Sequence, residues 1–392
     1  MTQKQTTLIT SGRDHTEFAS VNPPTYRAST ILFDSFDAFQ DAYYARAPKG
    51  LAYGRQGNPT THALSDTLSA LIDADYTLLT PSGLLAITTS LLAFVKSGDH
   101  ILISDSVYGP TRAFCEHTLG KMGVETTFYD PEITPADAAA LFKENTVLIF
   151  TEAPGSMTFE MQDIQGLCAL AHQHNCITMM DYTWATPLYI KPFELGVDIA
   201  IQAVTKYPAG HSDVVMGAIS TKEIHRKAIA KSSIQLGNYV SGDECNLALR
   251  GLRTMKARLD MQVRHTHEVI NYLKDQPEIA EILYPALKGA RGHEIWKEQM
   301  SGACALFAVA LNTDISRKQV ETFCNHLHHF GMGFSWGGYE SLIIPYRPHE
   351  TRIATQSRWG KEQWLLRFHI GLEDPQDLIA DVKAAFDAMR AL

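Results

Sequence analysis

The chain has 392 residues, enough for two domains or for one large domain with a smaller companion. Its 45% hydrophobic and 20% charged residues are typical of a soluble globular protein. The net charge of -9, with no basic tract of five or more residues, argues against a nucleic-acid partner, because phosphate binding needs a surplus of Lys and Arg.

The amino-terminal residues and the apolar runs carry no membrane or export signal. Residues 1–7 are polar and lack the apolar core of a signal peptide, and the longest apolar run, 303–311, is far shorter than the about 20 residues that cross a bilayer. The six cysteines are scattered and include no C-x-x-C pair, which is typical of reduced thiols rather than a disulfide framework or zinc site. We therefore expect a cytoplasmic protein with no membrane partner and no bound metal.

The first sixty residues lack sustained periodicity. They contain Pro23, Pro24, Pro48 and Pro59, and proline interrupts both helices and strands. Residues 1–60 are therefore interpreted as an N-terminal arm.

A second pattern follows over residues 61–255, where short apolar runs alternate with helical stretches. Candidate strands span 76–80, 100–104, 147–151, 177–181, 198–203 and 214–220. Helical patterns between them span 84–95, 111–121, 135–143 and 163–174. This alternation, with nearly continuous apolar strands, predicts a large α/β domain whose mostly parallel sheet is covered on both faces.

A long helical pattern over 242–273 leads into a smaller α+β region, which we place at residues 256–392. Its candidate elements are a strand at 304–311, a helix at 317–330, a strand at 365–370 and a final helix. In that final helix Leu378, Val382, Phe386 and Met389 recur at helical spacing, which indicates a packed face.

Three predicted strand ends carry groups suited to chemistry. In open α/β sheets, ligands bind beyond the carboxyl ends of the strands. One strand ends in Asp181, one leads to Lys206, and the first leads through Ser82 and Gly83 into a helix. An amine, a carboxylate and a helix amino terminus are what pyridoxal 5'-phosphate (PLP) needs for its aldehyde, its ring nitrogen and its phosphate. On the residues alone, Asp181 as a helix cap and Lys206 as a solvated lysine remain open alternatives.

Longer sequence motifs favour the PLP site over these alternatives. The chain closely resembles the Cys/Met-metabolism family of PLP-dependent enzymes over essentially its whole length, most specifically at YGR (53–55), EAPGS (152–156), QAVTKY (202–207), GHSD (210–213), SWGGYESL (335–342) and RFHIGLED (367–374). The resemblance implies the PLP-dependent transferase-like fold (fold type I). We therefore expect a large domain with a mostly parallel seven-stranded sheet and a smaller C-terminal α+β domain.

The resemblance also implies roles for individual residues. Lys206 resembles the Schiff-base lysine, which also shuttles the Cα proton, and Asp181 would pair with the ring nitrogen. Tyr108 resembles the aromatic residue that stacks on the cofactor ring. Together with Lys206, Tyr108 and Tyr53 are the residues that the resemblance implies to be catalytic.

A further set of residues resembles the phosphate site of the family. Gly83 and Leu84 would supply backbone N–H groups, and Thr205 would add a hydroxyl. Tyr53 and Arg55 resemble residues that reach the phosphate from a neighbouring subunit. The resemblance therefore implies self-association, as a homotetramer built from two dimers.

The substrate end of the site is implied in the same way. Arg367 resembles the arginine that binds the α-carboxylate of an amino-acid substrate, for which a planar guanidinium is suited. Ser335 and Trp336 would help to position that carboxylate.

The implied reaction is β-elimination from cystathionine, giving homocysteine, pyruvate and ammonia. Family members that act at Cγ, as synthases, lyases or methionine-cleaving enzymes, are alternatives, as are cysteine or cystine β-lyases. Trp336 favours β-elimination, because γ-acting relatives generally have a smaller aliphatic residue before Gly337. A regulatory protein that only binds PLP is another alternative, whereas a nicotinamide-dependent dehydrogenase is disfavoured because no G-x-G-x-x-G follows the first strand.

Three positions depart from the family pattern. Tyr182 stands where the family usually has Asn, Ala203 where many members carry a phosphate-binding serine, and Pro187 follows shortly after Asp181. These changes bear on substrate preference more than on the use of PLP.

Two other patterns are tempting but are interpreted as structural. The run 211–213 reads His-Ser-Asp, but neighbouring side chains diverge, and hydrolase triads are assembled from distant segments. His326, His328 and His329 lie near a predicted helix end, where basic groups suit the helix dipole without any metal.

Overall fold

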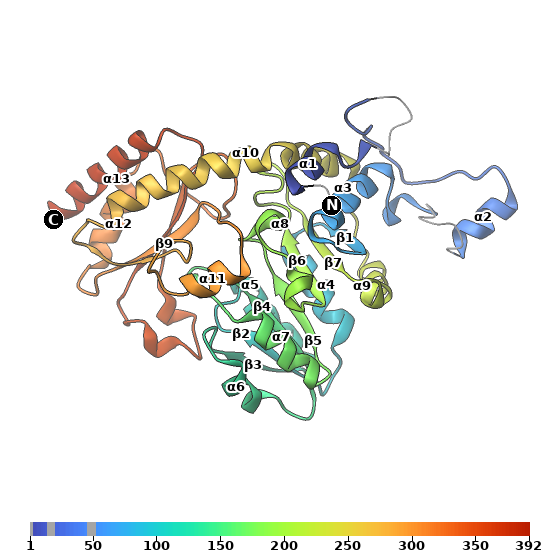
Figure 1. Ribbon diagram of the computed structural model, residues 1–392, viewed down its shortest axis with the longest axis horizontal. Coiled ribbons are helices and arrows are strands. Elements are labelled where there is room, and N and C mark those ends of the chain that lie inside the picture. The colour runs from blue at the N-terminus through green and yellow to red at the C-terminus, as the bar shows by residue number, and fades with distance from the viewer. Residues whose placement is uncertain (1–2, 14–19, 45–51) are drawn as a thin grey trace.

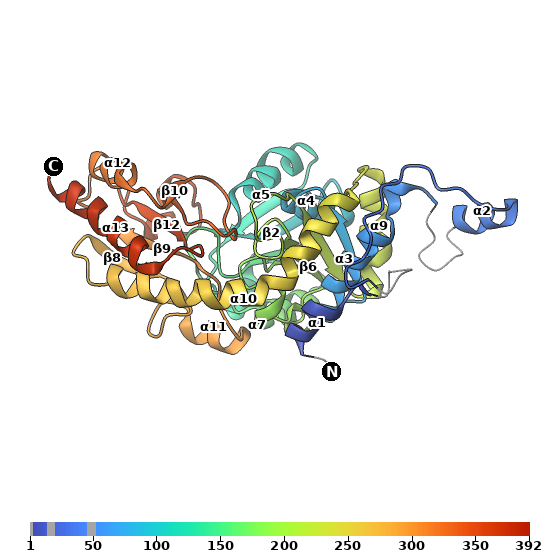
Figure 2. The same ribbon diagram turned by 90° about the horizontal axis from the view of Figure 1, so that it is seen from above.

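The computed structural model describes residues 3–13, 20–44 and 52–392. Figures 1 and 2 show a central α/β unit with a second sheet unit at one end and an extended arm at the other. The long helix α10 (Gly242–Leu273) runs along the central unit and the second sheet unit and connects them. In the described part of the chain, no helix is both long and apolar enough to span a membrane.

The central unit is built on a seven-stranded sheet. Its strands are β1 (Tyr76–Thr80), β2 (His100–Ser104), β3 (Glu125–Tyr129), β4 (Thr146–Glu152), β5 (Ile177–Asp181), β6 (Ile199–Ala203) and β7 (Gly217–Thr221). They lie in the order β1-β7-β6-β5-β4-β2-β3, and β7 runs antiparallel to both of its neighbours while the other pairs are parallel. The prediction of a mostly parallel seven-stranded sheet is therefore confirmed.

Helices cover both faces of this sheet, as parallel strands require. The helices of the central unit are α3 (Pro59–Ile72), α4 (Gly83–Phe94), α5 (Gly109–Ala113), α6 (Pro135–Ala138), α7 (Ile164–Gln173), α8 (Thr186–Tyr189) and α9 (Glu223–Gln235). Side chains of α4 and α9, such as Ile87 and Ile229, share one core with alternate strand residues. Leu167 of α7 and Leu64 of α3 pack in cores that hold the intervening strand residues on the other face.

The second unit is a five-stranded sheet with helices. Its elements are β8 (Ile279–Leu283), α11 (His293–Gln299), β9 (Leu306–Leu311), α12 (Arg317–His326), β10 (Gly331–Met332), β11 (Leu342–Tyr346), β12 (Leu365–His369) and α13 (Pro375–Arg390). The strand order is β10-β11-β12-β9-β8. Stacked rings of Phe307 and Phe368, with Phe323 against Phe386, fill the space between this sheet and α12 and α13.

The helix α10 (Gly242–Leu273) joins the two units and has the predicted bounds. Ser241 caps its first turn by accepting a hydrogen bond from the Glu244 amide at 3.2 Å. Because α10 runs without a break across residues 255 and 256, the division of the chain at that point stays a prediction.

The arm contains short helices joined by extended chain. They are α1 (Lys4–Thr10), α2 (Phe36–Tyr43) and a 3-10 turn, η2 (Gly54–Gln56). Both views show α2 projecting well away from the central unit (Figures 1 and 2).

Candidate active site

The carboxyl ends of β4, β5 and β6 lie side by side and form the floor of a cavity of about 260 Å³. Glu152 at the end of β4 is the register partner of Asp181 at the end of β5. Nine of the eleven predicted site residues line this cavity, namely Gly83, Leu84, Tyr108, Asp181, Thr205, Lys206, Ser335, Trp336 and Arg367. The cavity also receives residues from the second unit, so it lies where the two units meet.

Lys206 lies just beyond β6, with its amine inside the cavity. The Nζ atom donates a hydrogen bond to Ser335 Oγ at 2.8 Å and lies 5.3 Å from the centre of the Trp336 ring. Burial, and then the charge of Arg367, lower the pKa of Lys206 to about 8, while the charge of Asp181 opposes the shift. A lowered pKa leaves a larger fraction of the amine neutral and therefore nucleophilic.

Asp181 is buried at the end of β5. Its Oδ1 accepts a hydrogen bond from the Thr183 amide at 2.9 Å. Burial raises the pKa of Asp181, while hydrogen bonds from Thr183 and the charge of Lys206 oppose the shift. A cation placed beside this carboxylate would therefore be strongly stabilised, because both groups are shielded from water.

Glu152 also lines the cavity, although no role was predicted for it. Its Oε2 accepts the backbone N–H of Tyr108 at 2.8 Å. Burial, and then the charge of Asp181, raises the pKa of Glu152 well above its usual range. Its place at a strand end, beside another strand ending in Asp181, is the signal that could have identified it. Glu152 fixes the start of α5, and with it the backbone that carries the Tyr108 ring.

The amino terminus of α4 opens into the same cavity. Ser82 caps the helix by accepting the Leu85 amide at 3.0 Å, and the first amides of a helix have no partner within it. A Cβ atom at Gly83 would lie 2.8 Å from Ala203 Cβ, so glycine is needed for α4 to pack this closely on β6. The free amides at residues 83 and 84 therefore form an anion-binding end beside Lys206.

Thr205 lies in the cavity wall, but its hydroxyl already has partners. Thr205 Oγ1 donates to the Met216 carbonyl at 3.1 Å and accepts the Met216 amide at 2.9 Å. It therefore fixes the start of β7 relative to the Lys206 loop.

Arg367 extends from β12 into the cavity. One Nη2–H donates to the Ser335 carbonyl at 2.9 Å, and Nη1 contacts the thioether of Met157 at 3.6 Å. Nε is buried without a partner among the described residues. Burial lowers the pKa of Arg367 to about 10, so the group stays cationic at neutral pH. Nη1 therefore faces only a weak sulfur acceptor and Nε faces none, so both N–H groups are available to a carboxylate ligand.

Tyr53 and Arg55 are the two predicted residues that do not line the cavity. Both belong to the arm, where Arg55 Nη1 donates to the Ile234 carbonyl at 3.3 Å and Tyr53 is 47% exposed. Their expected reach into a neighbouring subunit stays a prediction.

Tyr182, one of the three departures, points away from this cavity. Its side chain is 1% exposed in the core on the other side of β5, within reach of Ser220. Because consecutive strand residues face opposite sides of the sheet, Tyr182 cannot touch a ligand held by Asp181. The Asn-to-Tyr departure therefore changes the core rather than the site.

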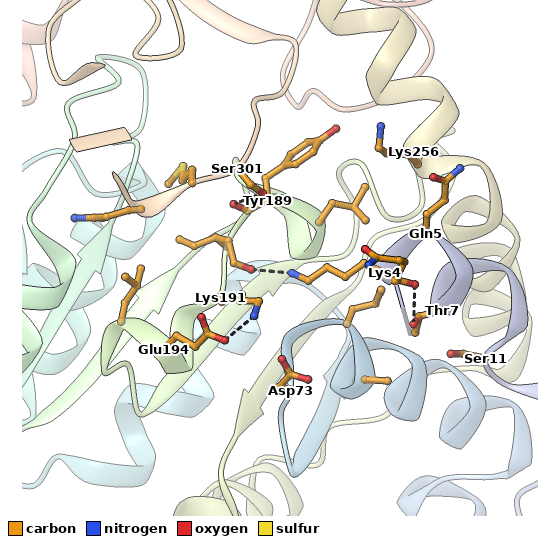
Figure 3. Close-up of a pocket in the computed structure, with 18 of the residues that line it drawn as sticks. Lys4, Gln5, Thr7, Ser11, Asp73, Tyr189, Lys191, Glu194, Lys256 and Ser301 are labelled. Atoms are coloured by element: carbon orange, nitrogen blue, oxygen red, sulfur yellow. Dashed lines mark hydrogen bonds and ion pairs between the residues drawn. The ribbon is translucent and has the colours of Figure 1, made fainter. Parts of the chain in front are cut away.

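A second and larger hollow of about 1290 Å³ lies between α1, α8 and α11 (Figure 3). Two of the lysines that line it have partners nearby. Lys4 donates to the carbonyls of Pro187 at 2.6 Å and Ile190 at 3.1 Å, and Lys191 pairs with Glu194 at 2.6 Å. None of the predicted site residues lines this hollow.

The other sequence patterns have structural partners. His211 Nδ1 contacts the Ala209 carbonyl at 2.8 Å, and Ser212 donates to the Glu340 carboxylate rather than facing His211. Within the described ranges, no group of three His, Cys, Asp or Glu residues is placed to hold a metal ion.

Comparisons with known proteins agree with this geometry. Residues 5–387 match the family model described as Cys/Met metabolism PLP-dependent enzyme. A cystathionine beta-lyase of Bordetella avium is 39% identical over 373 residues, covering 94% of this chain and 92% of that protein. An L-alanine/L-glutamate racemase of Wolbachia pipientis is 38% identical over 401 residues, covering 100% of this chain and 98% of that protein.

Solved structures show the same fold. The cystathionine gamma synthase of Xanthomonas oryzae, determined with aminoacrylate and cysteine, superposes with a TM-score of 0.89 at 27% identity. That match covers 100% of this chain and 99% of the other. The expected fold and the expected cofactor, PLP, are therefore confirmed at the level of the family.

Proposed function

Because this chain belongs to the Cys/Met-metabolism family of PLP-dependent enzymes, we propose that it is a cystathionine β-lyase. The observation that carries the proposal is the cavity in which an amine, a buried carboxylate and an arginine from the second unit converge. Lys206, Asp181 and Arg367 are the residues concerned.

The cavity has a group for each part of the cofactor. Lys206 would form the covalent attachment, Asp181 would keep the ring nitrogen protonated, and Tyr108 would lie against the ring. The amides at Gly83 and Leu84 would bind the phosphate, helped by the positive end of α4. When bound, PLP supplies an aldehyde for the substrate amine and a ring that stabilises negative charge at the substrate Cα.

The chain's own residues would then position the substrate and move its proton. Arg367 would bind the α-carboxylate through its guanidinium N–H groups, with the Met157 thioether giving way. The Lys206 amine, once free, would take the proton from Cα. Its hydrogen bond to Ser335 Oγ at 2.8 Å gives this amine a fixed direction, as general base catalysis requires.

The bonds balance as a β-elimination. The Cα–H and Cβ–S bonds break, the electron pair of the Cβ–S bond leaves on sulfur, and the thiolate is protonated to homocysteine. The remaining three-carbon fragment takes up one water and gives pyruvate and ammonia. Lys206 takes up the Cα proton in this scheme and can return one.

Trp336 supports β-elimination over reaction at Cγ. Its ring packs against Tyr207, with ring centres 5.6 Å apart, and borders the Lys206 amine. An enzyme that expels a γ-group must also move a proton at Cβ, which needs room beside the same amine. The indole beside this amine would leave less room for such a step.

The test is the identity of the keto acid formed from cystathionine. We expect pyruvate, together with homocysteine and ammonia, and no product from the Lys206→Ala variant. Formation of 2-oxobutyrate would show reaction on the γ side and contradict the proposal. Cystine and S-alkyl cysteines, run beside cystathionine, would rank the possible β-substrates.

Racemisation is a second candidate, favoured by the 38% identity to a protein named as an L-alanine/L-glutamate racemase over all of this chain. Such a reaction would use the same Cα proton but would break no bond to sulfur. Incubation with L-alanine or L-glutamate, followed by chiral separation, distinguishes it. Appearance of the D-isomer at a rate above that of pyruvate formation from cystathionine would favour the racemase.

The cell location and assembly are part of the same proposal. We propose a cytoplasmic enzyme that acts on a small amino acid and assembles as a homotetramer, with Tyr53 and Arg55 completing a neighbour's site. Both residues belong to the arm and lie outside their own chain's cavity, which supports this arrangement.

A further inference from the structure

A short segment of the second unit is fastened onto two loops that border the active-site cavity. The segment is residues 352–355, which we call the strap, and it follows β11. Arg352 is 5% exposed and Thr355 is 1% exposed. Such burial of a charged side chain requires specific partners.

The first anchor of the strap is Asp105, directly after β2. Its carboxylate is fully buried and accepts the amides of Ile353 at 3.0 Å and Thr355 at 2.8 Å, and the Thr355 hydroxyl at 2.7 Å. Arg112 of α5 binds the same carboxylate at 2.6 Å. Asp105 therefore joins the strap to the loop that leads to Tyr108.

The second anchor is the loop of residues 155–160. The Arg352 guanidinium donates to the Asp105 carbonyl, to the Ser156 carbonyl at 2.8 Å and to the Thr158 hydroxyl. The Ser156 amide in turn donates to the Ser106 carbonyl at 2.7 Å. One guanidinium thus spans both loops.

These two loops carry side chains of the active site. Tyr108 lies at the end of the first loop, and Met157 lies in the second between the two residues that Arg352 binds. Met157 has a backbone φ of +68°, a conformation that costs free energy for a non-glycine residue and must be held by its surroundings. Its sulfur contacts the Arg367 guanidinium at 3.6 Å.

We propose that Arg352 is a positioning residue that sets the affinity for the amino-acid substrate, by holding Met157 and the Tyr108 loop in register around Arg367. Arg352 does not line the cavity, so it acts through these loops. If these loops loosen, Met157 and Arg367 can move. The contact between Arg367 and the substrate carboxylate depends on their orientation and is then weakened.

A lysine could not replace this arginine. The planar guanidinium presents five donors in a fixed fork, which is how it reaches acceptors on two separate loops, whereas an ammonium is a point charge. Arg358 offers a matched control in the same region, because it forms ion pairs with Asp130 and Glu132 in which each side chain is about 30% exposed.

The test compares Arg352→Lys with Arg358→Lys in the holoenzyme. Glycine is the probe, because it has a carboxylate and an amine but no leaving group, and its binding is followed by the change in cofactor absorbance. We expect the dissociation constant of glycine to rise about tenfold in Arg352→Lys and to change less than twofold in Arg358→Lys. With a cleaved substrate, KM should rise similarly while kcat changes less than threefold.

A purely structural role would give a different pattern. It would lower the thermal midpoint and the amount of active enzyme, and so kcat, while leaving glycine binding and KM unchanged; that result overturns the proposal. Thr158→Val is a second variant should Arg352→Lys not fold, because it frees the 155–160 loop and leaves Asp105 anchored. It should also weaken glycine binding, and unchanged binding in it would contradict the proposal.

A readout without cofactor completes the test. Hydrogen exchange at the Ser156 and Phe159 amides of the cofactor-free protein should become at least tenfold faster in Arg352→Lys, and equal exchange would contradict the proposal. The inference rests on the binding of an amino acid at Arg367 and not on β-elimination. Its failure is therefore distinguishable from failure of the proposed reaction, which the keto-acid assay reports.

Discussion

Among the residues that the structure describes, two lysines have strongly lowered pKa values, and their surroundings explain why one of the two has the position of a cofactor lysine. Burial lowers the pKa of both Lys4 and Lys206 to about 8. Lys4 is held by two backbone carbonyls in the larger hollow (Figure 3). Lys206 instead faces Asp181 and the free end of α4. A reactive amine becomes a cofactor site only where groups for the ring and phosphate surround it.

The lowered pKa of Lys206 predicts the pH dependence of cofactor attachment. A lysine reacts with an aldehyde only when neutral, and at pH 7 a pKa of about 8 leaves roughly a tenth of the amine neutral, against less than about a thousandth for a free lysine. Mixed with PLP, the cofactor-free protein should therefore react faster as pH rises and level off above about pH 8. Stopped-flow absorbance measures this rate.

N-acetyl-lysine amide is the control for this experiment, because it experiences the same ionisations of PLP. Its rate should continue to rise beyond pH 10. Parallel profiles for the protein and the control amine would show that the site does not activate the lysine.

Among the helices and strands, the close contact between α4 and β6 determines where the phosphate-binding end of α4 lies. The Gly83→Ala variant would place a methyl group 2.8 Å from Ala203 Cβ, which forces the helix away from the strand. We expect a loss of about 1–3 kcal/mol in stability, as for other overpacked contacts, and weaker retention of PLP. Thermal unfolding and cofactor dissociation measure the two effects.

The double variant Gly83→Ala, Ala203→Gly is the matched control. It removes the atom that the new methyl group meets, so it should recover most of the stability lost in Gly83→Ala alone. A single variant as stable as the original protein would show that this contact does not fix the position of α4.

The strands that sequence patterns predicted best are short apolar runs that lie between turn residues. The predicted bounds of β1, β2 and β5 agree with the structure. A short apolar run with turn residues on both sides is compatible with few structures other than a strand. The strands β3, β8, β10 and β11 were missed. Of these, β3 begins with Glu125 and is largely polar, and β11 contains Pro345. The helix predicted to reach residue 330 ends at His326, because Asp381 binds the amides of the next residues.

The same distinction applies to the site: residues marked by a local sequence pattern could be predicted, and residues defined by contacts between distant segments could not. Lys206, Asp181 and Gly83 were predictable because strand ends and a helix start are local features. Met157 and Arg352 were not, because their roles depend on contacts between residues that are about 200 positions apart in the sequence. No local pattern indicates that residues 352–355 fold back onto Asp105.

At the scale of the whole molecule, the arm is the feature that the single chain does not explain. The helix α2 stands away from the central unit (Figures 1 and 2), with Phe36 and Tyr43 73% and 67% exposed. Large exposed apolar side chains on a projecting element commonly mark a contact surface. This agrees with the proposed role of the arm in a neighbouring subunit.

Subunit complementation tests that role. Neither Arg55→Ala nor Lys206→Ala should be active alone, but a mixed dimer has one site with Lys206 from one chain and Arg55 from the other. After co-refolding of equal amounts, about a quarter of the sites should be intact, by the symmetry of random pairing. Turnover of cystathionine measures the recovery.

The baseline for this comparison is the summed activity of the two variants refolded separately. Recovery no higher than that baseline, together with a single mass corresponding to a mixed assembly, would show that the arm does not complete the partner's site.

The most direct test of the account as a whole is the position of the cofactor on the chain. The purified protein is treated with borohydride, which fixes the bound cofactor to its lysine, and the peptides are sequenced by tandem mass spectrometry. We expect the phosphopyridoxyl group on Lys206. A protein that retains the cofactor on another lysine, such as Lys4, or that takes up none from added PLP, would contradict it.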